Sequence, residues 1–285
     1  VYYIGNLQLA RLRPGQAIFY DLNGDEIEIE PTEITFSAEA AEKGGYEYFM
    51  MKEIHEQPKA VLDTLNSVLK EDRIDLSEVG LTDEEIQNIS QIYIVACGSA
   101  WHVGMAAQYI FEDLAELPVR VELASEFRYR RMPLDSNALV VIISQSGETA
   151  DSLAALREAK TKGLKTMGIV NVVGSSIARE ADRVFYTLAG PEIAVATTKA
   201  YSAQLIACDI LAVQFGKVRG KLTEEQYGEL IAKLRLLPEE MSRLLEEKER
   251  IQWFAAKFAS AKDVFFVGRG IDYAIGLEGS LKMKE

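Results

Sequence analysis

The chain has 285 residues, of which 48% are apolar and 26% charged, and its formal net charge is −13. That length suffices for one large domain or two ordinary ones, and the apolar fraction predicts a globular protein with a buried core. The negative charge argues against binding to nucleic acid or to acidic membranes, because contacts with phosphate groups there depend on Lys and Arg. No apolar run reaches the roughly 18 residues of a membrane helix, Val1 to Asn6 lack the features of a secretion signal, and only two cysteines are present. We therefore expect a soluble, cytoplasmic protein.

The first 30 residues have the pattern of short strands. Ala17–Tyr20 and Ile27–Glu30 flank a turn that contains Asn23-Gly24, a dipeptide typical of tight hairpins. The sequence therefore predicts a β-hairpin at the start of the chain.

A linker and two helices follow the hairpin. Residues 31–45 are mixed and polar, and Tyr46 to Gln57 has helical spacing. We expect this helix to end before Pro58, because proline disfavours a helical conformation in the preceding residue. A second helix is predicted from Ala60 to Leu69, and the acidic run Thr82–Glu85 predicts the start of another.

Five apolar segments alternate with helical patterns between residues 91 and 188. They are Ile92–Ala96, Val119–Leu123, Leu139–Ile143, Thr166–Val170 and Val184–Leu188. Strands that are apolar on both faces and separated by helices indicate a parallel sheet covered on both sides. The predicted fold class is α/β, a three-layer sandwich with a five-stranded parallel sheet.

The rest of the chain is predicted to be mainly helical, with one more strand. Residues 196–247 have helical patterns interrupted by Gly220 and Pro238, and Val264–Val267 reads as a strand that leads through a glycine turn into a helix from Ile271. This strand, turn and helix repeat the plan of Ile92–Gly98, which suggests the start of a second copy of the domain. Both chain ends then look cut from something longer.

The loop Ser144-Gln145-Ser146-Gly147-Glu148-Thr149 is the strongest candidate for a binding site. Ligands of open parallel sheets bind beyond the carboxyl ends of the strands, where loops enter helices. The loop offers three hydroxyl groups, an amide, a glycine that permits close approach and the N-terminus of a helix, so it could hold a phosphate without a cation. The alternative is that its hydroxyl groups only cap the helix.

Two other loops leave the carboxyl ends of predicted strands. Cys97-Gly98-Ser99-Ala100 could bring the Ser99 hydroxyl over the same site, and Thr197 and Thr198 begin a long helix. Helix capping is the alternative for all three hydroxyl groups. Cys97 is expected to be a buried structural thiol, and His102 a packing or hydrogen-bonding residue rather than a base.

Ser144 to Asp151 resembles the signature of the sugar isomerase (SIS) domains of the glutamine:fructose-6-phosphate aminotransferase family. Several other segments resemble the family in the same order: Ala40–Tyr46 with Met51–Pro58, Glu122–Arg130, Pro191–Lys199 and Leu277–Glu285. The likeness covers nearly the whole chain.

The resemblance implies a domain plan and an activity. Residues 1–45 would be the end of a glutaminase domain plus linker, 46–250 the first SIS domain, of flavodoxin-like or Rossmann-like fold, and 251–285 the start of a second SIS domain. The whole enzyme would convert fructose 6-phosphate and L-glutamine to glucosamine 6-phosphate and glutamate, as a homodimer that needs no cofactor and no metal. We expect this chain to bind sugar phosphate but to make no glucosamine 6-phosphate from glutamine by itself. The main alternative is a non-catalytic SIS module that senses a sugar phosphate.

The resemblance also implies roles for individual residues. Phosphate would be held by Ser144, Gln145, Ser146 and Thr149, and the sugar would meet Ser99, the Val195 carbonyl and Thr197. Glu285 would be the base of the isomerisation and Lys282 a nearby proton-transfer group. A carboxylate in hydrogen-bond reach of the carbon acid is what this chemistry requires. The chain departs from the family at Ala100, where a second hydroxyl residue is usual, which removes one polar contact to the ligand.

Overall fold

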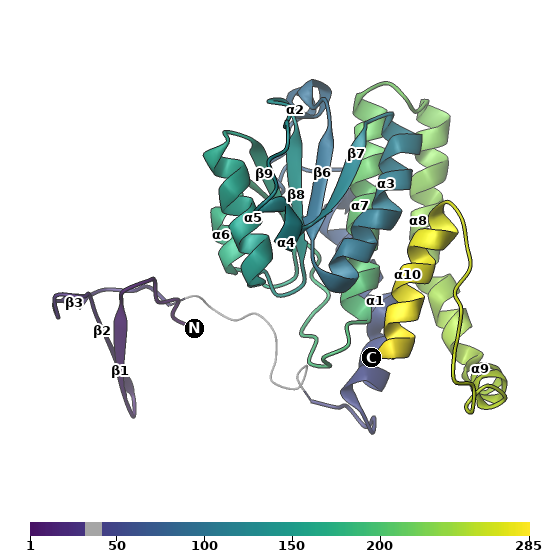
Figure 1. Ribbon diagram of the computed structural model, residues 1–285, viewed down its shortest axis with the longest axis horizontal. Helices are drawn as coiled ribbons and strands as arrows, with labels where there is room; N and C mark the ends of the chain where they lie inside the picture. Colours follow the sequence, from purple (N-terminus) through teal and green to yellow (C-terminus); the bar gives the residue numbers. More distant parts are fainter. Residues whose placement is uncertain (32–41) are drawn as a thin grey trace. The chain divides into compact units, whose positions relative to one another are not determined.

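The computed structural model describes residues 1–31 and 42–285, and contacts divide the chain into two units, residues 1–40 and 41–285 (Figure 1). The first unit is a three-stranded antiparallel sheet of β1 (Leu9–Arg13), β2 (Gln16–Tyr20) and β3 (Glu26–Ile27). The predicted hairpin is confirmed as β2 and β3, and β1 was not predicted. The first residues of the predicted linker segment Ala40–Tyr46 lie outside the described residues.

The second unit is built on a parallel sheet of five strands. These are β6 (Ile92–Ala96), β7 (Val119–Leu123), β8 (Leu139–Ser144), β9 (Lys165–Val170) and β10 (Arg183–Tyr186). Their order is β10-β9-β8-β6-β7, and every neighbouring pair is parallel. The predicted α/β class and five-stranded sheet are confirmed. Because the chain continues from β6 to an edge strand and then returns to β8, the order reverses between β6 and β8.

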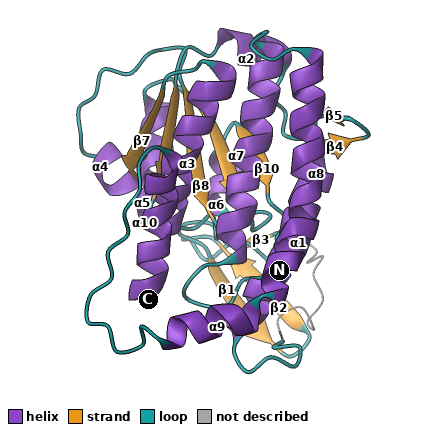
Figure 2. Ribbon diagram, turned by 90° about the vertical axis from the view of Figure 1, so that its right-hand side faces the viewer, coloured by secondary structure: helices purple, strands orange, loops and turns teal. Residues whose placement is uncertain are grey.

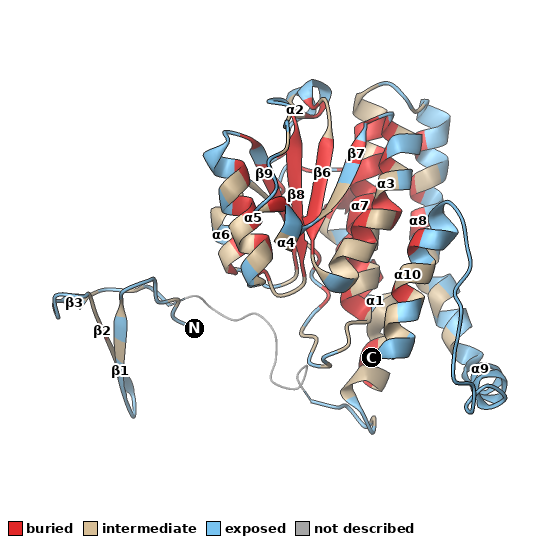
Figure 3. Cartoon of the chain, in the orientation of Figure 1, coloured by how far each residue is buried: buried red, intermediate tan, exposed pale blue. Residues whose placement is uncertain are grey.

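The central strands are buried on both faces, which is why they read as continuous apolar runs (Figure 3). In β6, Ile92, Ile94 and Ala96 belong to the core on one side of the sheet, whereas Tyr93 and Val95 belong to the core on the other. This alternation follows from the two-residue period of a strand. Two helical layers are therefore needed, one for each face.

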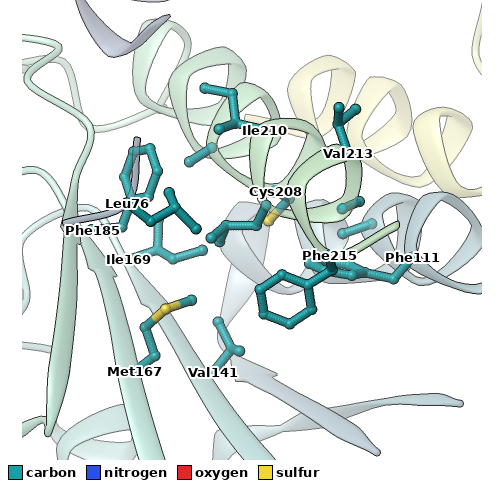
Figure 4. Close-up of a cluster of buried hydrophobic side chains, with 14 of the residues drawn as sticks. Leu76, Phe111, Val141, Met167, Ile169, Phe185, Cys208, Ile210, Val213 and Phe215 are labelled. Atoms are coloured by element: carbon teal, nitrogen blue, oxygen red, sulfur yellow. The ribbon is translucent and has the colours of Figure 1, made fainter. Parts of the chain in front are cut away.

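Both helical layers are present (Figures 1 and 2). One face is covered by α3 (Gly98–Ala115) and α7 (Lys199–Val218), with α1 (Phe49–Val68) and α8 (Glu224–Glu246) packed outside them; the other is covered by α4 (Ala124–Phe127), α5 (Ala150–Thr161) and α6 (Ser176–Glu180). The remaining elements are β4 (Leu69–Lys70), β5 (Arg73–Ile74), α2 (Asp83–Asn88), α9 (Lys248–Ala256) and α10 (Ile271–Lys284). In the larger core, the rings of Phe111 and Phe215 meet edge to face at 5.5 Å (Figure 4).

The prediction of two helices separated by Pro58 was wrong, because α1 is one helix with Pro58 inside it. A proline in a helix leaves the carbonyl four residues earlier without its usual N–H donor. Here that carbonyl belongs to Ile54, and the Gln57 side-chain amide donates to it at 3.1 Å. The side chain beside the proline thus replaces the missing bond, and α1 continues to Val68.

The predicted strand Val264–Val267 was also wrong, since these residues are irregular and exposed. A strand needs a neighbour that accepts and donates its backbone hydrogen bonds. No described strand lies beside this segment in the sheets of the chain. The following helix is present as α10, and it packs along α3. That residues 251–285 begin a second SIS domain stays a prediction.

Asp209, on α7, is expected to make stability depend on pH. Its Oδ1 atom is shielded from solvent and has no hydrogen-bond partner among the described residues, and burial raises the pKa of the Asp209 carboxyl to about 7. Between about pH 4 and 7 the folded state then keeps a proton that the unfolded chain releases, so the free energy of unfolding falls as the pH rises. Between pH 5 and pH 8 the wild-type free energy of unfolding should fall by about 2–3 kcal/mol from this group, and Asp209→Asn should remove this fall.

Urea unfolding of both proteins at pH 5 and pH 8 measures this effect. Asp113→Asn, at an exposed position of the adjacent helix α3, is the control and should leave the difference between the two pH values unchanged. Wild-type and Asp209→Asn proteins with the same pH dependence would contradict the prediction.

Candidate active site

A cavity of about 290 Å³ lies where the loops after β6 and β8 meet. These are the two strands between which the sheet order reverses, the place where open α/β sheets bind ligands. The cavity is lined by Cys97, Ser99, Ala100, Ile143, Ser144, Gln145, Ser146, Thr149, Glu192, Ala194, Val195, Thr197, Gln204 and Glu285. Eight of the nine residues predicted to form the site are in this lining. The ninth, Lys282, contacts one of them.

The loop between β8 and α5 is held in shape by its own hydroxyl groups. The hydroxyl oxygen of Ser144, a buried residue, accepts a hydrogen bond from the Gly147 N–H at 3.1 Å and shares one of 3.0 Å with the Thr149 hydroxyl. The Ser146 hydroxyl accepts from the Glu148 N–H at 3.2 Å. The turn is therefore formed before any ligand binds.

The start of helix α6 fixes the same turn from outside. The Gly147 carbonyl accepts from the Ile177 N–H at 3.0 Å, and the Glu148 carboxylate accepts from the Ser176 N–H at 2.7 Å. Gly147 has φ +65°, and a Cβ atom there would lie 2.0 Å from Ser175 Oγ. Only glycine suits this position, since the left-handed conformation and the close approach both exclude a side chain.

The hydroxyl groups do not act as simple helix caps. Thr149 and Thr198 are the N-cap residues of α5 and α7, yet neither side chain accepts a capping hydrogen bond. Ser99 lies one residue inside α3, whose N-cap is Cys97. The capping alternative thus does not explain why Ser99 and Thr149 face the cavity.

The charge around the cavity is unusual for an anion site. The lining residues include two carboxylates, of Glu192 and Glu285, and among the described residues no Lys or Arg lines it. Three helices begin at the loops that form the cavity, and in two of them, α3 and α5, no described side chain caps the first N–H groups. Free N–H groups and the positive dipole ends of such helices attract an anion. A phosphate group would be held here by neutral donors.

The loop before α7 forms another side of the cavity. The Glu192 carboxylate accepts hydrogen bonds from the Thr197 hydroxyl at 2.5 Å and from the N–H groups of Thr198 and Ala200 at 2.9 and 3.1 Å. It therefore caps α7 in place of Thr198. The Thr197 hydroxyl donates to Glu192, so toward a ligand it offers its oxygen as an acceptor.

Glu285 reaches the cavity because α10 packs along α3. Lys282 lies one turn earlier, forms an ion pair with Glu285 and lies 3.5 Å from Glu278. The Nδ1 atom of His102 lies 2.7 Å from Glu278 Oε2, so His102 joins α3 to α10 and has the hydrogen-bonding role expected for it. A carboxylate thus lines the cavity, and an ammonium group is paired with it.

Six lining residues were not predicted as site residues: Cys97, Ala100, Ile143, Glu192, Ala194 and Gln204. Glu192 and Gln204 carry no local signal, because an acid beside a proline and a glutamine in a helix are ordinary surface patterns. Cys97 was expected to be buried, but it is only partly buried and lines the cavity. In the described parts of the chain, no group of His, Cys, Asp and Glu has the arrangement of a metal site. Nor does any described helix meet the length and apolarity of a membrane span.

Comparison with known proteins places these features in a family. Residues 85–214 match the SIS domain model. The chain is 48% identical over 286 residues to the glutamine–fructose-6-phosphate aminotransferase (isomerizing) of Caldanaerobacter subterraneus subsp. tengcongensis, and 50% identical over 286 residues to that of Clostridium acetobutylicum. Each match covers 100% of this chain and 47% of the relative. The chain therefore spans about half the length of the curated relatives it matches.

Solved structures agree with this result. The C-terminal domain of glucosamine-fructose-6-phosphate aminotransferase from Francisella tularensis superposes with a TM-score of 0.82 at 40% identity, over 86% of this chain and 68% of that one. A glucosamine-6-phosphate deaminase from Thermotoga maritima shares only the fold, with a TM-score of 0.58 at 21% identity over 82% of this chain and 66% of that one.

Proposed function

Since this chain belongs to the glutamine–fructose-6-phosphate aminotransferase family, we propose that it supplies the fructose 6-phosphate site and the isomerising carboxylate of such an enzyme. The reaction of the whole enzyme converts fructose 6-phosphate and glutamine to glucosamine 6-phosphate and glutamate. The observation that carries the proposal is one cavity that combines a preformed hydroxyl and N–H loop with the carboxylate of Glu285. A longer protein would supply the nitrogen from glutamine.

In this proposal the loop after β8 binds the phosphate. Ser144, Gln145, Ser146 and Thr149 offer hydroxyl and amide donors, and the start of α5 adds free N–H groups. Ser99, the Val195 carbonyl and Thr197 lie on other sides of the same cavity and meet the sugar. The phosphate end and the sugar end are thus bound by different loops.

Glu285 is the proton-transfer group of the proposed reaction. Once nitrogen has replaced oxygen at C2 of the ketose, the Glu285 carboxylate removes a proton from C1 and returns it to C2, which moves the double bond from C2 to C1. The Glu285 carboxyl holds this proton between the two steps. Lys282, paired with Glu285, exchanges protons with the sugar: the nitrogen gains one as C1 is deprotonated, and the C1 hydroxyl loses one as C2 is protonated. A carboxylate in the cavity, with an ammonium group paired to it, favours this enzyme over a module that only senses sugar phosphate. Cytoplasmic location and a homodimer belong to the proposal.

Ser146→Ala and Thr149→Ala are each expected to weaken fructose 6-phosphate binding about tenfold, because each removes a hydroxyl that bonds a charged phosphate. Isothermal titration of the purified chain with fructose 6-phosphate, glucose 6-phosphate and inorganic phosphate measures this. Thr161→Ala is the matched control: Thr161 lies at the far end of α5, where its hydroxyl donates to the Arg157 carbonyl. Binding that is equally strong in all three variants would place the phosphate elsewhere.

A further inference from the structure

The first turns of α1 contact the loop that forms the sugar side of the cavity. Glu53, which is 2% exposed, lies on α1, and its Oε1 atom accepts hydrogen bonds from the N–H groups of Ile193 at 2.6 Å and Ala194 at 3.1 Å. Ala194 and the next residue, Val195, line the cavity. A buried carboxylate from a distant part of the sequence therefore holds two consecutive peptide groups of this loop.

Further contacts fix α1 to the segments on either side of the loop. Lys199, 3% exposed at the start of α7, pairs with Glu56 at 2.7 Å, and the Ser202 hydroxyl donates to Gln57 at 2.6 Å. On the other side, the Thr64 hydroxyl donates to the Thr187 carbonyl. Ala60, Ala189 and Ala203 are buried together in the same region, and their small side chains let these elements approach closely. The contacts of α1 thus bracket residues 188–198.

We propose that Glu53 is a positioning residue for the sugar-binding side of the cavity, an inference that rests on the proposed function. By fixing the peptide groups of Ile193 and Ala194, Glu53 sets where the Val195 carbonyl and the Thr197 hydroxyl meet a hexose phosphate. We call the two hydrogen bonds from Glu53 to the Ile193 and Ala194 N–H groups the Glu53 clamp. This part of the loop has no regular secondary structure, so without the clamp it would sample many conformations that binding would have to exclude. Glu192 fixes the other end of the loop by capping α7.

The phosphate loop is fixed by a separate set of contacts. Its turn is closed by Ser144 and anchored by the Ile177 N–H, and neither contact involves α1. Loss of the Glu53 clamp should therefore weaken binding of the sugar part and spare the phosphate part. A residue that only stabilised the fold would affect both.

The test compares three variants by isothermal titration with fructose 6-phosphate and with inorganic phosphate. Glu53→Ala should raise the Kd for fructose 6-phosphate about tenfold and leave that for inorganic phosphate unchanged. Glu53→Gln keeps an oxygen that can accept both N–H bonds, and it should stay within about twofold of wild type. Asp63→Ala, on the same helix at a surface pair with Lys59, should change neither Kd.

Amide hydrogen exchange tests the clamp without any ligand. The backbone amide hydrogens of Ile193 and Ala194 should exchange faster in Glu53→Ala than in wild type, while the exchange rate of the Gly147 amide should be the same in both proteins. Equal weakening of both ligands in Glu53→Ala, or a tenfold loss in Glu53→Gln as well, would overturn the proposal. Unchanged exchange at Ile193 and Ala194 would overturn it whether or not the wild-type chain binds sugar phosphate. A wild-type chain that binds no fructose 6-phosphate would overturn the positioning role together with the proposed function, and the exchange data would still report whether the clamp exists.

Discussion

Replacing Gly147 with alanine is expected to weaken fructose 6-phosphate binding at least a hundredfold. The new Cβ atom would lie 2.0 Å from Ser175 Oγ and 2.5 Å from Ser175 Cβ, so the turn cannot keep its shape. Alanine also disfavours the left-handed conformation, φ +65°, by about 1–2 kcal/mol. The turn would have to move away from residues 175–177, and the Gly147 N–H would leave the Ser144 hydroxyl. Isothermal titration of wild type and variant measures the loss.

Gly163→Ala separates the effect of the steric collision from the effect of the left-handed backbone conformation. Gly163 follows α5, has φ +74°, and a Cβ atom there would meet nothing within 4 Å. Alanine at this position has the same unfavourable backbone conformation but collides with nothing. Because Gly163 does not line the cavity, the affinity of this control variant for fructose 6-phosphate should equal that of wild type. A Gly147→Ala protein that binds within threefold of wild type would show that this turn does not hold the phosphate.

Replacing Gly216 with alanine is expected to destabilise the protein by about 3 kcal/mol, although alanine normally favours a helix. Gly216 lies near the end of α7, where a Cβ atom would be 2.4 Å from the Leu114 carbonyl oxygen of α3. That neighbour is backbone and cannot rotate away, so α3 and α7 must separate. These two helices cover one face of the sheet, which makes the separation costly. Urea unfolding monitored by circular dichroism gives the change in free energy.

Gly228→Ala provides a control of opposite sign. Gly228 is an exposed residue inside α8, and a Cβ atom there would meet nothing within 4 Å. Alanine should therefore stabilise the protein by about 0.5–1 kcal/mol through its better helix propensity. If both variants changed stability by the same amount, close packing between α3 and α7 at Gly216 would be refuted.

The sheet was predictable because its signal is local. Strands β6 and β8 are buried on both faces, and full burial requires apolar residues at every position, which the sequence displays directly. The predicted strand Val264–Val267 shows the limit of this signal. Its apolar residues satisfy the same pattern, but strand formation depends on a neighbouring strand, and a local pattern does not report whether one is present.

The continuation of α1 through Pro58 also lay beyond the sequence rules. Those rules weigh the lost backbone bond and the steric restriction, whereas the helix is kept by the Gln57 side chain and by packing of α1 on α7 and α8. Tertiary contacts of this kind override local preference.

The candidate site was predictable where motifs follow strands. Ser99 and the loop from Ser144 to Thr149 come directly after β6 and β8, so the rule for open sheets locates them. The same rule singled out Thr197 at the start of a helix, but Val195 and Glu285 were reached only through the family resemblance. Glu53 and Glu192 were not singled out at all, because each acts on peptide groups that only the folded chain brings near. Their carboxylates look like any surface acid in the sequence.

The two halves of the cavity differ in how firmly they are attached to the protein. The hydroxyl loop is continuous with β8 in the centre of the sheet, whereas Glu285 sits at the end of α10, whose main packing partner is the single helix α3. Elements with few buried contacts open with less free energy than the core does. Under the proposed function, release of α10 alone would leave a site that still captures a phosphorylated sugar but lacks the proposed acid–base group. Capture and chemistry can therefore fail separately, at different temperatures or denaturant concentrations, within one folded chain.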